Sequence, residues 1–206
     1  MLISDSMQKI IRVLLNKKKI GLRNLADEAD VSLGITVKIT NQLQNTGYIR
    51  KGKNIVVLEF FKLLNAWAYS VSIKEIDKTE FTGAERPQYL IKKISNIANQ
   101  NKLEYGFTLF SASELCCPYV APGKTHLYIR KNQIEAWEKC LSGNNIFPGE
   151  KGNIILYLAD DSFLYNKQKI DNSYLTSYPQ LYIDLFSYGG RGEDAAEHLL
   201  EVFKNV

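Results

Sequence analysis

Residues 20–58 restrict the fold of this chain more than any other stretch. They hold two short helical patterns around a tight turn, followed by two β-branched runs on either side of Lys51-Gly52-Lys53-Asn54. Ser32 is placed to cap the second helix, and Gly47 is placed to end it. Helix, turn, helix and basic hairpin in this order are the layout of a winged helix-turn-helix. We therefore predict this module, which inserts one helix into a DNA groove, at the N-terminal end of the chain.

Three segments of this region carry apolar residues at helical spacing, so three helices can share one core. The most N-terminal helix is predicted to begin after Ser4 as its N-cap, with Asp5 in the first turn. The apolar positions of the three helices are, in chain order, Met7, Ile10, Ile11, Leu14 and Leu15; Leu22, Leu25, Ala26 and Ala29; and Thr36, Ile39 and Leu43.

The opposite face of the last of these helices carries small, basic and amide side chains, which suit base edges and phosphates. We expect Lys38 and Asn41 to reach the major groove. The basic residues around the hairpin's glycine turn are expected to contact phosphates. The predicted DNA-binding residues are Ser32, Gly34, Val37, Lys38, Asn41 and Gln42 on the helix, and Arg50, Lys51 and Lys53 on the hairpin.

Charge is distributed unevenly along the chain. The whole sequence carries +4, yet residues 1–70 hold 11 Lys and Arg against 5 Asp and Glu, a balance of +6, and residues 71–206 hold 15 against 17, a balance of −2. A basic N-terminal third agrees with a nucleic-acid-binding module. Two readings of Lys17-Lys18-Lys19 stay open, a solvated helix end or a contact with phosphate. A helix-turn-helix can also serve dimerisation or protein binding, but pattern and charge together favour double-stranded DNA as the partner.

Length and composition set the outer limits. At 206 residues, with 45% apolar residues and only five Pro, the chain has room for one large or two small folded domains. It has no run of about 18 apolar residues and no signal-peptide pattern, so we expect a cytoplasmic protein that does not enter a membrane. Cys116, Cys117 and Cys140 are odd in number and include an adjacent pair, which predicts reduced thiols rather than disulfides or zinc ligands.

The rest of the chain alternates helical and strand patterns, which predicts an α/β or α+β domain. A helix is expected over 60–72 and a linker over 73–85, so we divide the chain into a DNA-binding domain, 1–72, and a second domain, 73–206. The first of these helices should bury Phe61, Leu64, Ala68 and Val71. Further helices are expected over 86–102 (with Tyr89, Leu90, Ile94 and Ile97 inward), from Ser111 onward, and over 133–141, 179–188 and 193–204, with strands over 105–110, 126–130, 153–158 and 163–165.

Several segments imitate catalytic motifs. Gly123-Lys124-Thr125 lacks the first glycine of a phosphate-binding loop and precedes a strand, so the match fails. Gly190-Arg191-Gly192 is followed by too few residues for a dinucleotide-binding unit and fits a turn between two helices. Asp160-Asp161 is interpreted as a turn, because neighbouring strand residues point to opposite faces, and His126 and His198 as structural or surface residues. We predict no catalytic residue, metal site or cofactor.

Two stretches of the second domain resemble a known family. They are Cys117-Pro118-Tyr119-Val120, near a small-residue helix start, and the run from Asp184-Leu185 to Gly189-Gly190-Arg191-Gly192-Glu193-Asp194-Ala195-Ala196. Over almost its whole length the chain resembles the AbiEi-type antitoxins of type IV toxin-antitoxin systems, in the branch whose winged helix precedes a nucleotidyltransferase-like domain. The resemblance implies a repressor of its own operon that counteracts a nucleotidyltransferase toxin, and it leaves open whether the two proteins touch. It identifies no neutralising residue.

The resemblance also implies that the second domain is a degenerate nucleotidyltransferase-like mixed α/β domain. A working transferase needs a Gly-Ser helix start and two carboxylates on a strand to hold magnesium against a triphosphate. Here Ser111-Ala112-Ser113 stands at the helix start, and residues 126–130 contain no carboxylate. We therefore expect no enzyme activity.

Two other functional classes stay open on the sequence alone. One is a minimal nucleotidyltransferase that uses Asp160 or Asp161, and the other is a ligand-sensing transcription factor without an antitoxin role. A homodimer is expected if the operator is an inverted repeat, because two modules that read two half-sites need a symmetric contact to fix their spacing.

Overall fold

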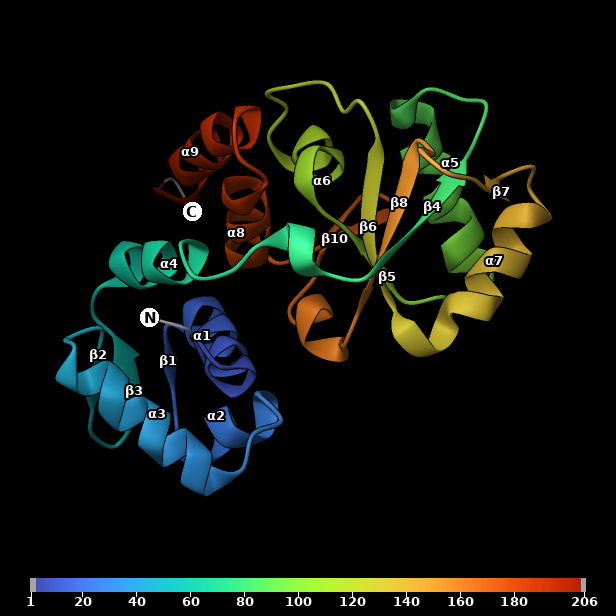
Figure 1. Ribbon diagram of the computed structural model, residues 1–206. Helices are drawn as coiled ribbons and strands as arrows, with labels where there is room; N and C mark the ends of the chain where they lie inside the picture. Colours follow the sequence, from blue (N-terminus) through green and yellow to red (C-terminus); the bar gives the residue numbers. More distant parts are fainter. Residues whose placement is uncertain (1–2, 205–206) are drawn as a thin grey trace. The chain divides into compact units, whose positions relative to one another are not determined.

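The computed structural model of the protein describes residues 3–204 (Figure 1). Contacts between residues divide the chain into two compact units, Met1–Val71 and Ser72–Val206, each with an apolar core of its own. Helices and sheets occur in both units, so the chain belongs to the mixed α/β class. Within the described residues no helix combines the length and the apolar character needed to cross a bilayer.

Over its described residues, the first unit contains four helices and one antiparallel sheet of three short strands (Figure 1). The strands lie in the order β1-β3-β2. The central strand pairs on one side with β2, to form the predicted hairpin, and on the other side with β1, which was not predicted. The elements are α1 (Asp5–Lys17), β1 (Lys19–Ile20), α2 (Leu22–Glu28), α3 (Leu33–Asn45), β2 (Ile49–Lys51), β3 (Ile55–Val57) and α4 (Phe60–Ala68).

The predicted start of α1 is confirmed. The Ser4 hydroxyl accepts a hydrogen bond from the backbone N–H of Met7 at 3.3 Å, and Asp5 lies in the first turn. All five predicted apolar positions of this helix are buried. Arg12 is buried as well, with its guanidinium carbon 5.1 Å from the ring centre of Trp67 in α4. This cation–π contact joins the first and last helices of the unit.

The helix after the hairpin differs from the prediction. α4 ends at Ala68 instead of Ser72, and Phe61, which was expected to be inward, is 40% exposed. The buried face consists of Leu63, Leu64, Trp67 and Ala68. The prediction failed because Leu63 and Trp67 define a second apolar line, one helical turn long, beside the line that was chosen.

The second unit is built on a mixed sheet with the strand order β7-β4-β8-β6-β5-β10-β9. Its central pair, β8 and β6, is parallel over six residue pairs. The strands are β4 (Lys78–Thr82), β5 (Tyr105–Phe107), β6 (Thr125–Arg130), β7 (Phe147–Pro148), β8 (Ile154–Ala159), β9 (Gln168–Ile170) and β10 (Ser173–Leu175). The helices are α5 (Pro87–Gln100), α6 (Leu109–Cys116), α7 (Ile134–Ser142), α8 (Tyr178–Tyr188) and α9 (Arg191–Lys204), with short 3-10 turns at Ile73–Glu75, Lys131–Gln133 and Asp161–Leu164.

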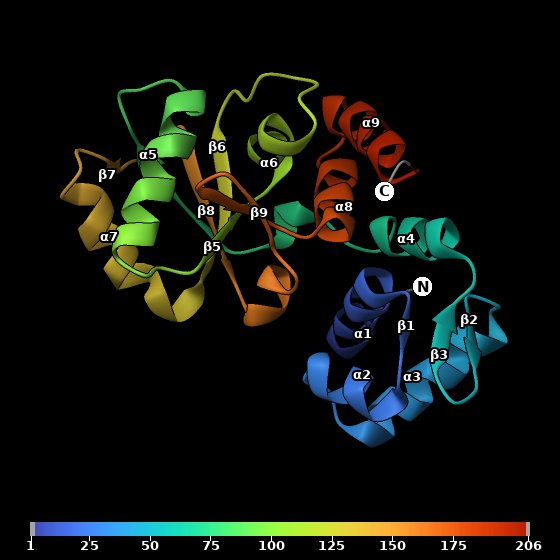
Figure 2. The ribbon, with the colours of Figure 1, turned by 180° about the vertical axis from the view of Figure 1, so that it is seen from behind.

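Different helices cover the two faces of this sheet (Figures 1 and 2). On one face, Tyr105 of β5 packs edge-on against Trp137 of α7, with ring centres 6.2 Å apart, and α5 lies beside it. Tyr128 pairs with Gly106 in the sheet, so its side chain points to the other face. There its hydroxyl donates a hydrogen bond to Asp184 of α8 at 3.0 Å. Figure 2 shows α5 in front of the sheet and the α8–α9 pair at its side.

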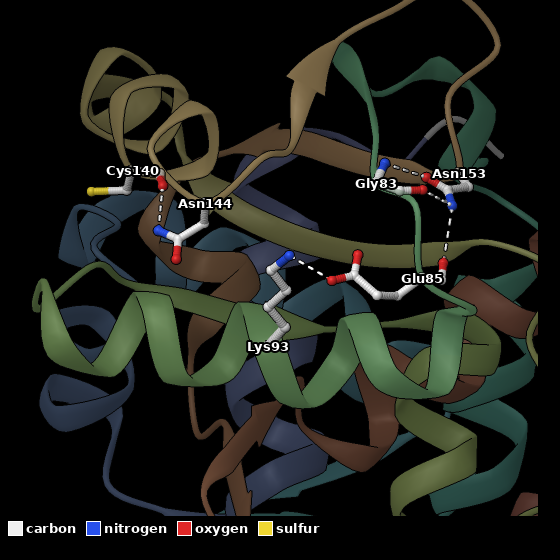
Figure 3. A network of polar contacts seen from close by, with 6 residues as sticks. All are labelled: Gly83, Glu85, Lys93, Cys140, Asn144 and Asn153. Carbon is white, nitrogen blue, oxygen red and sulfur yellow. Dashed lines mark hydrogen bonds and ion pairs between the residues drawn. The ribbon is translucent and has the colours of Figure 1, made fainter.

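One side chain joins the loop after β4 to the start of β8 (Figure 3). The amide group of Asn153 accepts a hydrogen bond from the Gly83 N–H at 2.9 Å and donates one to the Gly83 carbonyl at 2.9 Å. Nearby, Lys93 of α5 donates to the Glu85 carboxylate at 2.6 Å, which lowers the pKa of that carboxyl. These contacts fix the loop that leads from β4 into α5.

The expected linker over 73–85 is wrong. Ile73–Glu75 forms a 3-10 turn, and β4 pairs with β8 on one side and β7 on the other. Phe81 is the only strongly apolar side chain of β4, and it is fully buried, while two charged residues and two threonines occupy the other positions. A strand with a single apolar anchor has too weak a period-two pattern to stand out from a polar linker.

Several smaller boundaries also differ from the prediction. The strand over 105–110 ends at Phe107, because Thr108 caps α6 and Leu109 begins it with a left-handed φ of 50°. The strand over 163–165 is instead a 3-10 turn. Tyr89 is 65% exposed, while Ile91 and Ala98 take inward positions on α5. The strands β7, β9 and β10 were not predicted. The remaining helices and the strands β6 and β8 are confirmed within one or two residues.

Candidate nucleic-acid interface

One face of α3 is fixed against the core of the first unit. The helix begins after Ser32, whose hydroxyl accepts a hydrogen bond from the N–H of Ile35 at 3.4 Å. Its predicted apolar positions, Thr36, Ile39 and Leu43, are all buried. Thr40 is buried too, and its hydroxyl donates to the carbonyl of Thr36 at 2.8 Å. With these side chains inward, the opposite face of the helix is turned to solvent.

The predicted DNA-binding residues of α3 lie on that outward face. Val37 is half-buried at its edge, and the other five are exposed: Ser32, Gly34, Lys38, Asn41 and Gln42. Within residues 3–204, Lys38 makes no ion pair, so its ammonium group is available to an external anion. The face therefore presents one cation and two amides along about two helical turns.

The hairpin beside α3 is anchored by two isoleucines. Ile49 and Ile55 are buried, and the N–H of Gly52 donates to the carbonyl of Asn54 at 3.1 Å to close the turn. Arg50 and Lys53 are exposed, and neither makes an ion pair among the described residues. They remain the two hairpin cations that are open to a phosphate.

Lys51, the third predicted phosphate contact of the hairpin, has a partner on α3. Its ammonium group donates a hydrogen bond to the side-chain oxygen of Asn41 on α3. Because successive strand residues point to opposite faces, Lys51 lies on the α3 side with Ile49, while Arg50 points away. The hairpin and the outward face of α3 are thus joined directly through this one contact, which the sequence pattern gave no means to predict.

The first turn of α3 has a feature that the sequence analysis missed. Leu33 is 43% exposed and Ile35 is 45% exposed, on either side of Gly34. A Cβ added to Gly34 would meet no atom within 4 Å, so the fold does not require glycine there. An apolar, sterically open helix start suits close approach of a partner, and apolar side chains there can contact thymine methyl groups.

The lysine run that precedes β1 is mostly engaged within the unit. Lys17 forms an ion pair with Glu28 at 3.2 Å, and the Lys18 ammonium lies 5.9 Å from the ring centre of Phe60. Lys19 is exposed on β1. These partners favour the reading of Lys17 and Lys18 as part of the unit's own surface.

In the second unit, the polar cluster of most interest surrounds Asp184. This carboxylate is 2% exposed and accepts hydrogen bonds from Thr108 at 2.5 Å, Tyr128 at 3.0 Å and Gln180 at 2.8 Å. The donors come from the cap of α6, from β6 and from α8 itself. Because a buried carboxylate is costly without such partners, the cluster fixes α8 against the sheet.

The backbone after Asp184 requires glycine at two positions. Gly189 has a left-handed φ of 82°, and a Cβ on Gly192 would lie 2.3 Å from the carbonyl oxygen of Leu185. Ala195 and Ala196 are buried where α9 packs against α8. The prediction that this glycine run is a turn between two helices is confirmed.

Comparison with known proteins matches residues 56–203 to the family described as "Transcriptional regulator, AbiEi antitoxin, Type IV TA system". The chain belongs to this AbiEi antitoxin family. Searches of curated proteins and of solved structures gave no match. The family match begins within β3 and includes α4 and the whole sheet of the second unit. The outward face of α3 lies before it, so the interface is supported by its own geometry.

The AbiEi match includes the serine and aspartate residues that the sequence analysis considered as catalytic candidates. Ser111 is buried, and its hydroxyl accepts a hydrogen bond from the N–H of His126 at 2.9 Å, which ties α6 to β6. Asp160 caps a 3-10 turn, as predicted, by accepting from the N–H of Ser162 at 2.8 Å. Asp161 forms an ion pair with Arg130 at 2.7 Å. Each of these side chains has a structural partner.

Two further predictions concern cysteines and histidines. All three cysteines are free thiols, as predicted, and none is fully exposed.

His126 is 6% exposed in β6, where burial and the nearby Lys124 and Lys78 lower its pKa to about 4. It is therefore neutral at pH 7 and packs against Tyr157, with ring centres 5.9 Å apart. Across the described residues, no group of three His, Cys, Asp or Glu side chains could hold a metal ion.

Proposed function

We propose that this AbiEi-family protein is a DNA-binding repressor of its own operon, in which the first unit is a winged helix-turn-helix and α3 is the recognition helix. The observation that carries the proposal is the contact of Lys51 with Asn41 beside the exposed Lys38. A hydrogen bond between hairpin and helix presents both to one partner surface. The basic charge of this part of the chain supports a polyanionic partner.

For the second unit we propose the antitoxin role, directed against a nucleotidyltransferase toxin, and no enzyme activity of its own. The proposed fold is a degenerate nucleotidyltransferase-like domain. The Ser111 hydroxyl accepts a hydrogen bond from the His126 N–H, and the β6 residues that point to the Asp184 side of the sheet are His126, Tyr128 and Arg130 rather than carboxylates. Support comes from the family description, which combines regulator and antitoxin.

Operator binding can be tested with an Asn41→Ala variant. Mobility-shift titrations would use DNA from upstream of the gene as operator and a scrambled duplex of equal length. We expect the operator complex to weaken by about 1–3 kcal/mol, with little change for the scrambled DNA, because base-edge contacts carry discrimination. An unchanged ratio of the two affinities would remove Asn41 from the reading role.

A second variant separates base reading from support of the hairpin, since Asn41 also holds Lys51. If Asn41 reads a base, Asn41→Ala should lower operator discrimination in a Lys51→Ala background as well. If it only positions Lys51, the effect should vanish in that background, because the two residues would act as one unit.

Gel filtration of the same complexes would show whether two copies bind an inverted-repeat operator.

The enzyme alternative has a direct assay. Purified protein is incubated with labelled nucleoside triphosphates, Mg²⁺ or Mn²⁺, and total RNA. We expect no incorporation. Metal-dependent labelling that is lost in an Asp161→Asn variant would establish the transferase instead.

A further inference from the structure

The α8-facing side of the second unit's sheet contains a cavity of about 400 Å³ over β4, β8 and β6. Helix α8 covers β6 through the Asp184 cluster, and β4 and β8 extend beyond it. In the ladder, Lys78 pairs with Tyr157 and Glu80 pairs with Ile155, so these side chains share the face of Tyr128. The cavity volume falls within the range of small-ligand sites.

Positive charge dominates the lining of this cavity. Lys74, Lys78 and Lys124 line it together with one carboxylate, Glu80, while His126 is neutral at pH 7. The formal balance of these side chains is +2. Three ammonium groups come from three separate segments, namely the 3-10 turn at Ile73–Glu75, β4 and the chain just before β6.

Glu80 holds two of these ammonium groups at long range. Its Oε1 lies 3.9 Å from the Lys78 Nζ, and its Oε2 lies 3.7 Å from the Lys124 Nζ. The Oε2 atom is shielded from solvent and accepts no hydrogen bond. At these separations the pairs are electrostatic only, so both ammonium groups keep N–H donors for an added anion.

Neutral hydrogen-bonding rings form the floor of the cavity. His126 Nδ1 and the hydroxyl of Tyr157 lie 3.3 Å apart and share a hydrogen bond, and both residues are nearly fully buried. At the rim, Tyr188 of α8 is 38% exposed and lies edge-on to His126, with ring centres 6.2 Å apart. The site thus combines three ammonium groups with an aromatic edge.

From this arrangement we propose that the cavity binds a phosphate monoester of a small molecule, with Lys78 and Lys124 on the phosphate oxygens and Tyr188 beside the organic group. A dianionic phosphate neutralises the +2 balance of the lining, and it accepts several charge-assisted hydrogen bonds at once. A carboxylate ligand would leave one positive charge uncompensated. The proposal adds a ligand to the second unit and does not depend on DNA binding by the first.

The test uses the full chain and isothermal titration calorimetry with four probes: inorganic phosphate, glycerol phosphate, a nucleoside monophosphate and the matching nucleoside. We expect both monoesters to bind more tightly than inorganic phosphate, and the nucleoside not to bind. A higher affinity of the nucleotide than of glycerol phosphate would identify an aromatic ester as the ligand. Failure of every phosphate probe to bind would overturn the proposal.

Lys124→Gln and Lys78→Gln should each weaken monoester binding about tenfold, the loss expected for one charge-assisted hydrogen bond. Both side chains are more than two-fifths exposed, so the fold should tolerate the changes. The matched control is Lys131→Gln, an exposed lysine outside the cavity that pairs with Asp77 at 3.4 Å. An equal loss in the control would show non-specific attraction and would overturn the site.

Tyr188→Leu separates the organic group from the phosphate. The variant should lower the affinity for the nucleotide and leave that for inorganic phosphate unchanged. Equal effects on both would remove Tyr188 from the site. Operator binding by the same variants provides a separate readout, because it tests the proposed function of the first unit and not the cavity.

Discussion

Gly34 lies exposed on α3, where glycine has no folding advantage. An added Cβ would meet no atom within 4 Å, and the φ angle is not left-handed. Glycine in a helix costs about 0.5–1 kcal/mol relative to alanine, so this residue lowers the stability of the first unit. Close approach of DNA to the proposed recognition helix would account for glycine at this position.

Gly34→Ala should therefore move stability and DNA binding in opposite directions. We expect the free energy of unfolding to rise by about 0.5–1 kcal/mol, and operator binding to weaken by about 1–3 kcal/mol as the methyl group meets the DNA. Urea unfolding and mobility shifts measure the two quantities on one preparation. Unchanged operator affinity in a stabilised variant would mean that DNA does not approach this turn.

His126 links stability of the second unit to pH. Its pKa in the folded protein is lowered to about 4, chiefly by burial and then by Lys124 and Lys78, against an ordinary value of 6.5. The other ionisable residues that line the same cavity are Lys74, Glu80, Tyr157 and Tyr188. Between these two pH values the unfolded chain binds the extra proton, so stability is lost as pH falls from 6.5 towards 4.

The whole shift corresponds to on the order of 3 kcal/mol. His126→Gln should lose less stability between pH 7 and pH 4.5 than the wild type, because glutamine does not titrate. Urea denaturation at the two pH values gives the comparison, and the difference between the two proteins cancels the effect of the carboxylates. Parallel curves would show that His126 is not the linked group.

At the scale of elements, the hairpin's two exposed cations carry the next prediction. Arg50 and Lys53 make no ion pair among the described residues, whereas Lys51 is bonded to Asn41. Neutralising Lys53 to Gln should reduce the slope of log affinity against log salt by about one unit, because one fewer counterion is released. Operator titrations over a range of KCl concentrations measure this slope, with Lys131→Gln as a charge-matched control in the second unit.

Helices were predictable from sequence where caps and apolar spacing agreed. Ser4 and Ser32 both cap the helices that they were predicted to begin, and the buried faces of α1 and α3 follow from periodicity. Where two apolar lines competed, as Phe61 and Leu63 do on α4, periodicity alone chose wrongly. Local rules specify that a helix exists, but tertiary contacts decide which face it buries.

Strands and side-chain contacts were less accessible to prediction. β4 was not predicted from the sequence, because its partners, β7 and β8, lie more than 60 residues later in the chain. Phe81 is also its only apolar residue, so the strand has no clear alternating pattern. The outward residues of α3 were predictable, because the helix has a single buried face. The Lys51–Asn41 contact was not, because it depends on which way the hairpin leans.

At the scale of the whole molecule, the features that suggest DNA binding and those that suggest an antitoxin role lie in different units. The first has the basic charge and the outward face of α3, and the second has most of the AbiEi family match and the cationic cavity. Each unit has an apolar core of its own. Trp67 of α4 is buried in the first core, and Phe81 of β4 is buried in the second. This arrangement favours a division of labour between a DNA-binding domain and an antitoxin domain.

Fragments 1–71 and 72–206 should accordingly fold alone, the first binding operator DNA and the second countering a cognate nucleotidyltransferase toxin. A third fragment, 86–206, is the control, because it lacks β4 and should not fold. Circular dichroism melts report folding, mobility shifts report operator binding, and growth during toxin expression reports neutralisation. Rescue of growth by 1–71, or specific operator binding by 72–206, would contradict the division, and a folded 86–206 would remove β4 from the core.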